Sequence, residues 1–238
     1  ASDAPAINAR IATIYLDHLK LPSDAARYVE LAVGASPDMD EYLLFAEAMI
    51  SDRSLRGRSE WVPGLARSVR DVLSGRPGVE DRLLNVLKVQ VELAASPVES
   101  AASLRDIAAI ECGRGNLRGC FDGMAGALDM MPDDPEILGS FLDSARKAGT
   151  CGEAVEMLLT LSGGLEGDAS VRLGMSAAEM AHDDLGDPVK AAAIYTGIAE
   201  RNPGRVDILQ ALDAVYAAAD DNASRVPLLE RIAALTVA

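Results

Sequence analysis

The sequence is poor in aromatic residues, which make up 4% of its 238 residues, and it contains one Trp and two His. Because Ala, Leu, Val and Met must fill the interior instead, we expect helices that pack closely through small residues. Signals for β-strands are almost absent. With His18 and His182 as the two histidines, zinc ligands and general bases are in short supply. The composition therefore argues against an enzyme.

Cysteine is also scarce, since Cys112, Cys120 and Cys151 are the three in the chain. We expect no disulfide framework and interpret all three as small buried thiols. Cys112 and Cys120 nevertheless flank one turn and could face each other. Apolar runs of about 18 residues, which a membrane-spanning helix needs, are missing, and no signal peptide is evident.

Positive charge is low as well, because 22 Lys and Arg face 37 Asp and Glu, for a formal net charge of −15. Phosphate binding needs clustered cations, so this balance argues against nucleic acid as a partner. The negative charge either keeps an Ala-rich surface soluble or attracts a basic partner segment. The cations are mostly Arg, which hints at high-GC coding and favours a bacterial source.

What the sequence does have is repetition, seen most clearly in residues 101–134. Leu104, Ile107 and Ala108 form a helical stripe, and the turn 113–116 contains Gly and Asn, which tolerate left-handed backbone angles. A second stripe follows and ends at Pro132. It consists of Cys120, Met124, Ala127, Leu128 and Met131. The spacing predicts a helix–turn–helix unit.

Similar units follow at 135–168, 169–204 and 205–238, and one opens the chain at 7–37. A helix–turn–helix repeat of about 34 residues is typical of solenoid proteins.

At these residues the sequence resembles the tetratricopeptide repeat (TPR) family. One unit matches the family's pattern of small residues, turn glycine and closing proline at Ala108, Gly115, Cys120, Ala127 and Pro132, and another matches at Ala178, Gly186, Ala191 and Pro203. The resemblance implies an all-α fold, a right-handed α-α superhelix of about six hairpin units and about 13 helices. Leu142 and Arg225 stand where the family has small residues, and we expect less regular packing there.

We expect residues 1–238 to form a single solenoid, with an irregular helical section at 38–100 between the first hairpin and the four regular units. One helix between 51 and 100 lacks a hairpin partner in this register. Residues 52–59, which include Arg53, Arg56 and Arg58, are interpreted as a basic connector or a site for an acidic group. Ser162, Gly163 and Gly164 are a candidate flexible joint. We also expect the chain to be a piece of a longer or processed protein.

The resemblance implies a concave groove lined by the first helix of each unit. The polar lining residues carried over from it mix both charges, which suits an extended peptide. They are Arg105, Asp143, Arg146, Arg172, Glu179, His182, Asp207 and Gln210. The family's clamp for a peptide carboxylate needs an Asn where this chain has Ala109, so we do not expect that clamp.

Other polar clusters predict no chemistry. His182, Asp183 and Asp184 form either a metal or acid–base cluster or a polar helix end, and we favour the helix end because adjacent helical residues diverge. The glycine run at 113–119 follows a helix, which does not fit a phosphate loop. We therefore expect no catalytic residues, no metal and no cofactor.

The leading hypothesis for function is a non-enzymatic scaffold that binds a protein or peptide in the groove. The alternatives are a structural module that self-associates through its C-terminal end, as a homo-oligomer, and an enzyme or small-molecule sensor. We expect a cytoplasmic protein, with a periplasmic or processed one as the alternative.

Overall fold

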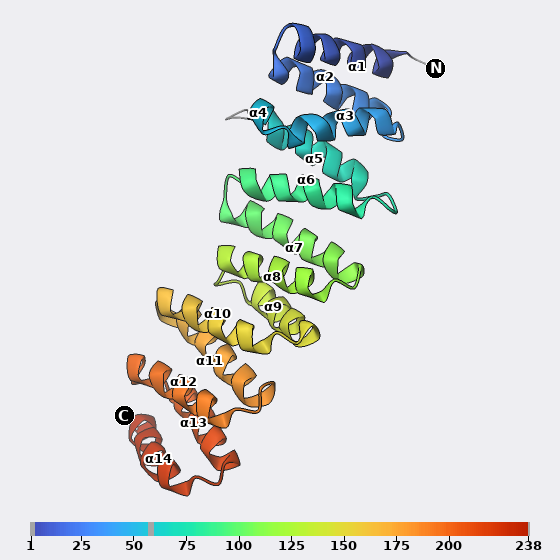
Figure 1. Cartoon of the computed structure of the whole chain (residues 1–238). Helices are drawn as coiled ribbons and strands as arrows, with labels where there is room; N and C mark the ends of the chain where they lie inside the picture. The colour runs from blue at the N-terminus through green and yellow to red at the C-terminus, as the bar shows by residue number, and fades with distance from the viewer. Residues whose placement is uncertain (1–2, 57–59, 238) are drawn as a thin grey trace. The chain divides into compact units, whose positions relative to one another are not determined.

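The computed structural model describes residues 3–56 and 60–237, and all regular elements in those ranges are helical (Figure 1). Two compact units divide the chain, Ala1–Met130 and Met131–Ala238. Thirteen α-helices of at least ten residues, one α-helix of four residues and one π-helical turn of five residues lie in the described ranges. The predicted all-α repeat fold, with about 13 helices, is confirmed.

The first unit contains α1 (Ala4–Thr13), the π-helical turn η1 (Ile14–His18), α2 (Pro22–Ala35), α3 (Asp40–Ser51), α4 (Arg53–Arg56), α5 (Trp61–Leu73), α6 (Glu80–Leu93), α7 (Pro97–Gly113) and α8 (Leu117–Met130). The second contains α9 (Pro135–Ala148), α10 (Cys151–Gly164), α11 (Gly167–Asp183), α12 (Pro188–Arg201), α13 (Val206–Ala218) and α14 (Asn222–Val237). Within each unit, consecutive helices pack against each other. This is the architecture of an α-helical repeat protein.

Local sequence signals explain where the helices begin and end. Pro135 and Pro188 are the first residues of α9 and α12, a position where the missing N–H has no intrahelical acceptor in any case. The side chain of Asp134 accepts hydrogen bonds from the N–H groups of Glu136 and Ile137 at 2.9 and 3.1 Å. Gly149 closes α9 with φ +69°, a left-handed conformation that glycine adopts without strain. These local signals thus set where the helices of each hairpin begin and end.

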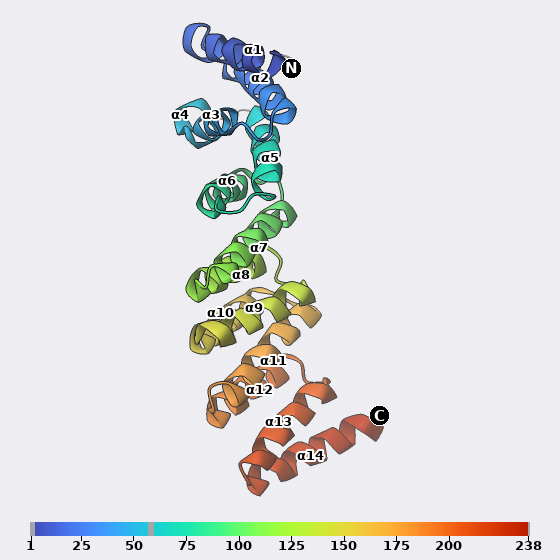
Figure 2. The ribbon, with the colours of Figure 1, turned by 90° about the vertical axis from the view of Figure 1, so that its right-hand side faces the viewer.

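The section at 38–100 is continuous in its packing. The helix α5 contacts α2, α3 and α6, and α6 in turn contacts α7. Figure 2 shows α3 and α6 on the left of the first unit and α5 on the right. Each of the three long helices of this section therefore packs against its neighbours. That residues 1–238 form a single solenoid stays a prediction.

An ion-pair network ties α3 to α6 in this section. Arg82 donates to Glu47 at 2.6 Å and to Asp40 at 3.2 Å, and Arg76 donates to Asp40 at 2.8 Å. The hydrogen bond from Arg82 is the main reason why the pKa of the Asp40 carboxyl lies below its usual range. Polar contacts therefore supplement apolar packing where the repeat is least regular.

Small and aliphatic side chains fill both interiors, as the composition predicts. Leu43, Leu65 and Leu73 are fully buried in the first unit, whereas Phe141 and Leu158 are fully buried in the second. Gly123 of α8 lies so close to α7 that a Cβ atom placed on it would be 2.9 Å from the Cβ of Ala108. Glycine is thus required for this helix crossing.

The expectation of three unpaired thiols is wrong for two of them. Cys112 and Cys120 form a disulfide bond, with their Cα atoms 5.0 Å apart. The turn at 113–116 brings the end of α7 opposite the start of α8, so residues eight apart in sequence face each other. Cys151 is a free, partly exposed thiol.

Two segments differ from the expected loops. Residues Arg53–Arg56 form α4 instead of an extended connector, and Arg58 lies outside the described residues. Ser162, Gly163 and Gly164 form the last turn of α10. Ser162 and Ser170 are buried there, and the hydroxyl of each donates to the carbonyl of the other at 2.8 and 2.7 Å. This exchange of hydrogen bonds fixes the α10–α11 joint.

No helix in the described ranges is both long and apolar enough to cross a lipid bilayer.

Candidate partner-binding surface

The eight predicted groove residues fall on the first helices of their hairpins. Arg105 lies on α7 in the first unit, and the other seven lie on helices of the second unit. They are Asp143 and Arg146 on α9, Arg172, Glu179 and His182 on α11, and Asp207 and Gln210 on α13. The candidate surface described below is therefore the part within the second unit.

The helix α11 carries the centre of this surface. Arg172 and Glu179 are seven residues apart, two helical turns, so both side chains lie on one face of the helix. A hollow of about 580 Å³ runs along that face. Its lining residues are Asp168, Val171, Arg172, Met175, Ser176, Glu179 and Arg205. Two of the predicted residues are thus brought together beside a cation and an anion that the prediction did not include. We call this feature the α11 hollow.

The guanidinium of Arg172, which lines the α11 hollow, is only partly satisfied by hydrogen bonds. Its Nη2 atom donates to the Asp133 carboxylate at 2.6 Å and to the Asp133 carbonyl oxygen at 3.1 Å. Its Nε atom is buried and has no hydrogen-bond partner among the described residues. The hydrogen bonds of Nη2 hold this guanidinium in place, and an acceptor that reached the buried Nε–H would satisfy a donor that is otherwise unfavourable.

Arg205 is the functional candidate that sequence reasoning missed. It lies immediately before α13 and donates to Asp207 at 2.7 Å and to Asp168. The hydrogen bond from Arg205 lowers the pKa of the Asp207 carboxyl. A cation in a turn has no helical periodicity, so its one available signal was the Arg-x-Asp spacing with Asp207.

Arg146 connects α9 to the end of α11. Its Nε atom donates to both carboxylate oxygens of Asp184, at 3.1 and 3.0 Å, and its Nη1 atom lies 3.4 Å from Asp143. The Asp184 hydrogen bond raises the pKa of the Arg146 guanidinium. Asp143 and Arg146 thus act together, as a charged pair at one edge of the surface.

The carboxyl of Glu179 is less acidic than an ordinary glutamate. Partial burial is the main cause of its raised pKa, and the charge of Asp183 adds to it. Burial likewise raises the pKa of Tyr195 to about 12, with smaller contributions from Glu179 and Asp183. This part of the surface therefore favours a hydrogen-bond donor or a cation opposite Glu179.

His182 lies beside an acidic residue at the end of α11. Its Nδ1 atom pairs with Asp183 at 2.7 Å, and no group of three metal-ligating side chains lies together in the described ranges. Burial and the charge of Asp184 raise the pKa of the Cys151 thiol, which disfavours the reactive thiolate. The arrangement suits binding through hydrogen bonds and ion pairs.

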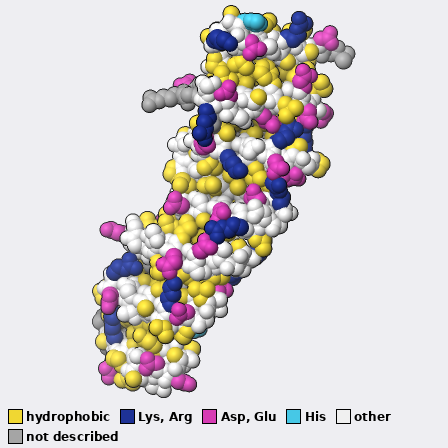
Figure 3. Space-filling view, viewed as in Figure 1, with side chains coloured by type: hydrophobic (Ala, Val, Ile, Leu, Met, Phe, Trp, Pro, Cys, Tyr) yellow, Lys and Arg dark blue, Asp and Glu magenta, His cyan; other side chains and the backbone are white. Residues whose placement is uncertain are grey.

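Gln210 is exposed on α13 and Arg105 is exposed on α7. Neither is brought into the α11 hollow. On the face turned to the viewer in Figure 3, cationic and anionic side chains are interspersed, with no large area of one sign.

Comparison with known proteins gives weak structural similarity only. No protein-family model matches the chain, and no curated protein matches it. One solved structure contains nearly identical TPR-like repeats assigned to a kinesin light chain of Podosopora anserina. It is 14% identical, with a TM-score of 0.35, and the alignment covers 99% of this chain and 97% of that one. A solved structure of a variant of that protein gives the same identity and TM-score over 93% and 100% of the two chains.

Proposed function

We propose that the chain is a non-enzymatic scaffold that binds an extended segment of a partner protein along α9, α11 and α13 of the second unit. The observation that carries this proposal is the α11 hollow, where a buried and unpartnered Arg172 donor lies on one helix face with Glu179. An extended peptide offers backbone carbonyls to such donors and N–H groups to such carboxylates.

Charge supports a peptide over nucleic acid. The chain has a formal net charge of −15, and the cations of the surface are already paired with carboxylates, as in Arg146 with Asp184 and Arg205 with Asp207. These carboxylates would repel a polyanion, whereas a peptide that carries both charges can form ion pairs with the carboxylates and with the cations.

The disulfide bond supports a proposal for the compartment. Bonds such as Cys112–Cys120 persist where thiols are not kept reduced. We therefore propose the periplasmic or otherwise oxidising alternative in place of the cytoplasm.

Loss of the hollow's central donor tests the binding proposal. The variant Arg172→Met keeps the aliphatic stem and removes the guanidinium. Arg27→Met, an exposed cation on α2, is the matched control for charge. We expect proteins captured from an extract of the source organism by the wild type and by Arg27→Met to be lost from Arg172→Met.

Equal capture by all three proteins would overturn the assignment to the α11 hollow. Capture of nothing, even by the wild type, would overturn the scaffold proposal. Circular dichroism of each variant confirms that it is folded.

A second candidate function is self-association through α14. Val226 and Leu229 on this helix are 57% and 44% exposed, and Leu228 is its one buried residue among those described. If this apolar surface pairs with another copy, the mass measured by analytical ultracentrifugation rises with concentration, and Leu229→Glu abolishes the rise. A mass that stays constant would exclude this role.

A further inference from the structure

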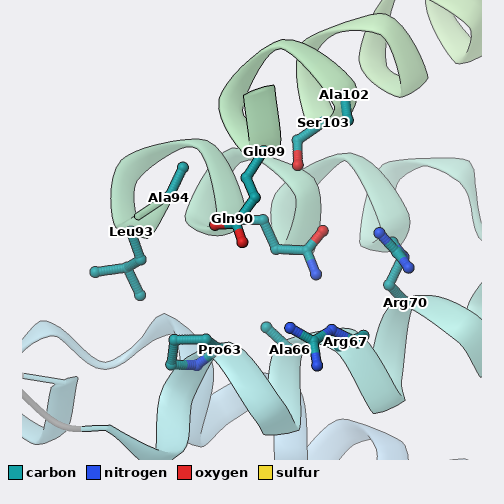
Figure 4. Close-up of a pocket in the computed structure, with 10 residues that line it drawn as sticks. All are labelled: Pro63, Ala66, Arg67, Arg70, Gln90, Leu93, Ala94, Glu99, Ala102 and Ser103. Atoms are coloured by element: carbon teal, nitrogen blue, oxygen red, sulfur yellow. The ribbon is translucent and has the colours of Figure 1, made fainter. Parts of the chain in front are cut away.

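A second polar cavity lies in the first unit, and its lining includes none of the residues assigned above. It has a volume of about 150 Å³ and is bounded by α5, α6 and α7 (Figure 4). Arg67 and Arg70 extend into it from α5, Gln90 from α6, and Glu99 and Ser103 from α7. A cavity of this size accommodates a molecule of about six non-hydrogen atoms.

The side chain of Gln90 gives the first indication of a ligand. Its Oε1 atom is buried and has no hydrogen-bond partner among the described residues. Figure 4 shows this amide reaching into the space between α5 and α7. A buried acceptor of this kind is satisfied by an N–H or O–H donor, so the occupant must carry at least one donor.

The charges around the cavity give the second indication. Arg67 and Arg70 contribute two positive charges. Asp71 accepts hydrogen bonds from Nε and Nη2 of Arg70 at 3.1 and 2.9 Å, and Glu99 supplies the second negative charge. The lining therefore carries two guanidinium groups and one carboxylate on different helices, and Asp71, which lies outside the lining, offsets the charge of Arg70. An occupant with one anionic and one cationic end matches this pattern.

The hydrogen-bonding groups of the cavity wall give the third indication of a ligand. Ser103 is buried and can donate from its hydroxyl. Oε2 of Glu99 accepts from the N–H of Ala95 at 3.0 Å, which fixes this carboxylate at the start of α7. The cavity thus has donors on α5 and α7 that suit a carboxylate. It also has acceptors on α6 and α7 that suit an ammonium group.

We propose that this cavity binds a small free α-amino acid. The carboxylate of the ligand lies against Arg67 and Arg70, and its ammonium group donates to Oε1 of Gln90 and to Glu99. The volume suits the smallest members of the class, glycine, L-alanine or L-serine, which have about five to seven non-hydrogen atoms. Binding here is independent of the α11 hollow and of the scaffold function.

Nuclear magnetic resonance of the ¹⁵N-labelled full chain tests the proposal. The probes are glycine, L-alanine and L-serine, each titrated to about 10 mM. We expect at least one of them to shift the side-chain amide signal of Gln90 in a saturable way. Blocking either charged end, as in L-alaninamide and N-acetyl-L-alanine, is expected to weaken binding at least about tenfold.

Two variants separate the cavity from a general charge effect. Gln90→Met has nearly the same shape and removes the acceptor, and we expect it to weaken binding at least about tenfold, measured by calorimetry. Arg67→Met is expected to do the same, whereas Arg27→Met on α2 leaves binding unchanged.

Three outcomes would overturn the proposal. The first is the absence of a saturable shift with all three amino acids, which would mean that a water molecule satisfies Gln90. The second is equal binding of the blocked compounds. The third is tight binding of trialanine without binding of L-alanine, which would make the occupant a peptide end and not a free amino acid.

Discussion

Single charged side chains in this protein connect neighbouring hairpins. Arg172 pairs with Asp133, Lys190 with Glu156, and Arg205 with Asp168. The partners are 39, 34 and 37 residues apart, close to one repeat. Exposed pairs of this kind each contribute little stability, about 0–1 kcal/mol. Their regular offset nevertheless favours one register of hairpin stacking over a slipped one.

The charge of Glu179 carries a prediction for pH dependence. Because its pKa is raised above the ordinary 4.5, the folded state holds a proton that the unfolded state has released. Stability is therefore expected to fall as the pH rises from 4.5 through the folded-state pKa. Glu179→Gln should remove this decline, as measured by urea unfolding across that range.

Glu230→Gln, which removes an exposed carboxylate of α14, is the matched control. A pH profile of Glu179→Gln that coincides with the wild type would contradict the effect of burial on this carboxyl. Asp40 and Asp207 act in the opposite direction, since their lowered pKa values add stability that is lost as the pH falls below the ordinary 3.8.

At the scale of helices, α7 and α8 approach each other so closely that a side chain does not fit at Gly123. A methyl group on Gly123 would lie 2.9 Å from the Cβ of Ala108 and 3.0 Å from its backbone. Gly123→Ala is therefore expected to destabilise the protein by about 1–3 kcal/mol through overpacking. Denaturant unfolding of the purified variant measures this loss.

Gly139 on α9 provides the matched control, because no atom lies within 4 Å of a Cβ placed there. Gly139→Ala should stabilise the chain by about 0.5–1 kcal/mol through its gain in helix propensity. We expect changes of opposite sign in the free energy of unfolding for Gly123→Ala and Gly139→Ala. Changes of the same sign would contradict the close approach at Gly123.

The α7–α8 hairpin is also closed by the Cys112–Cys120 disulfide bond. A crosslink over so short a loop restricts the unfolded chain and contributes about 2–3 kcal/mol. We expect the double variant Cys112→Ala/Cys120→Ala to lose about 2–3 kcal/mol of unfolding free energy. Dithiothreitol should lower the melting temperature of the wild type and leave that of the double variant unchanged. Cys151→Ala is the control, since Cys151 has no disulfide partner.

An equal response of the wild type and the double variant to dithiothreitol would show that the two sulfurs are not bonded.

At the scale of the whole molecule, each of the two units has buried residues of its own. Phe141 is fully buried in the second unit, and Phe141→Ala is expected to cost about 3–5 kcal/mol there. In a repeat protein each element depends chiefly on its neighbours. Hydrogen exchange should therefore accelerate in α9–α12 and stay unchanged in α1–α3.

Val189→Ala, which truncates a side chain that is 79% exposed, should change stability by less than about 0.5 kcal/mol. Loss of protection in α1–α3 as large as that in α9–α12 would mean that the chain unfolds as one cooperative body.

The sequence by itself determined the helices and their hairpins. Apolar residues at helical spacing specify the buried faces, and residues such as Pro135, Gly149 and Pro188 specify where helices start and stop. These signals are local, so they can be read without knowing the neighbours. Arg172 and Glu179, in contrast, were assigned to the groove through the resemblance to the TPR family.

Only the tertiary structure decided which polar groups meet. Arg205 lines the α11 hollow from a turn, and Gln90 lines a cavity from the last turn of α6. Cys112 is bonded to Cys120 across a turn whose geometry the sequence left open. Such meetings depend on distances between separate helices, and those distances are set by how neighbouring helices pack together.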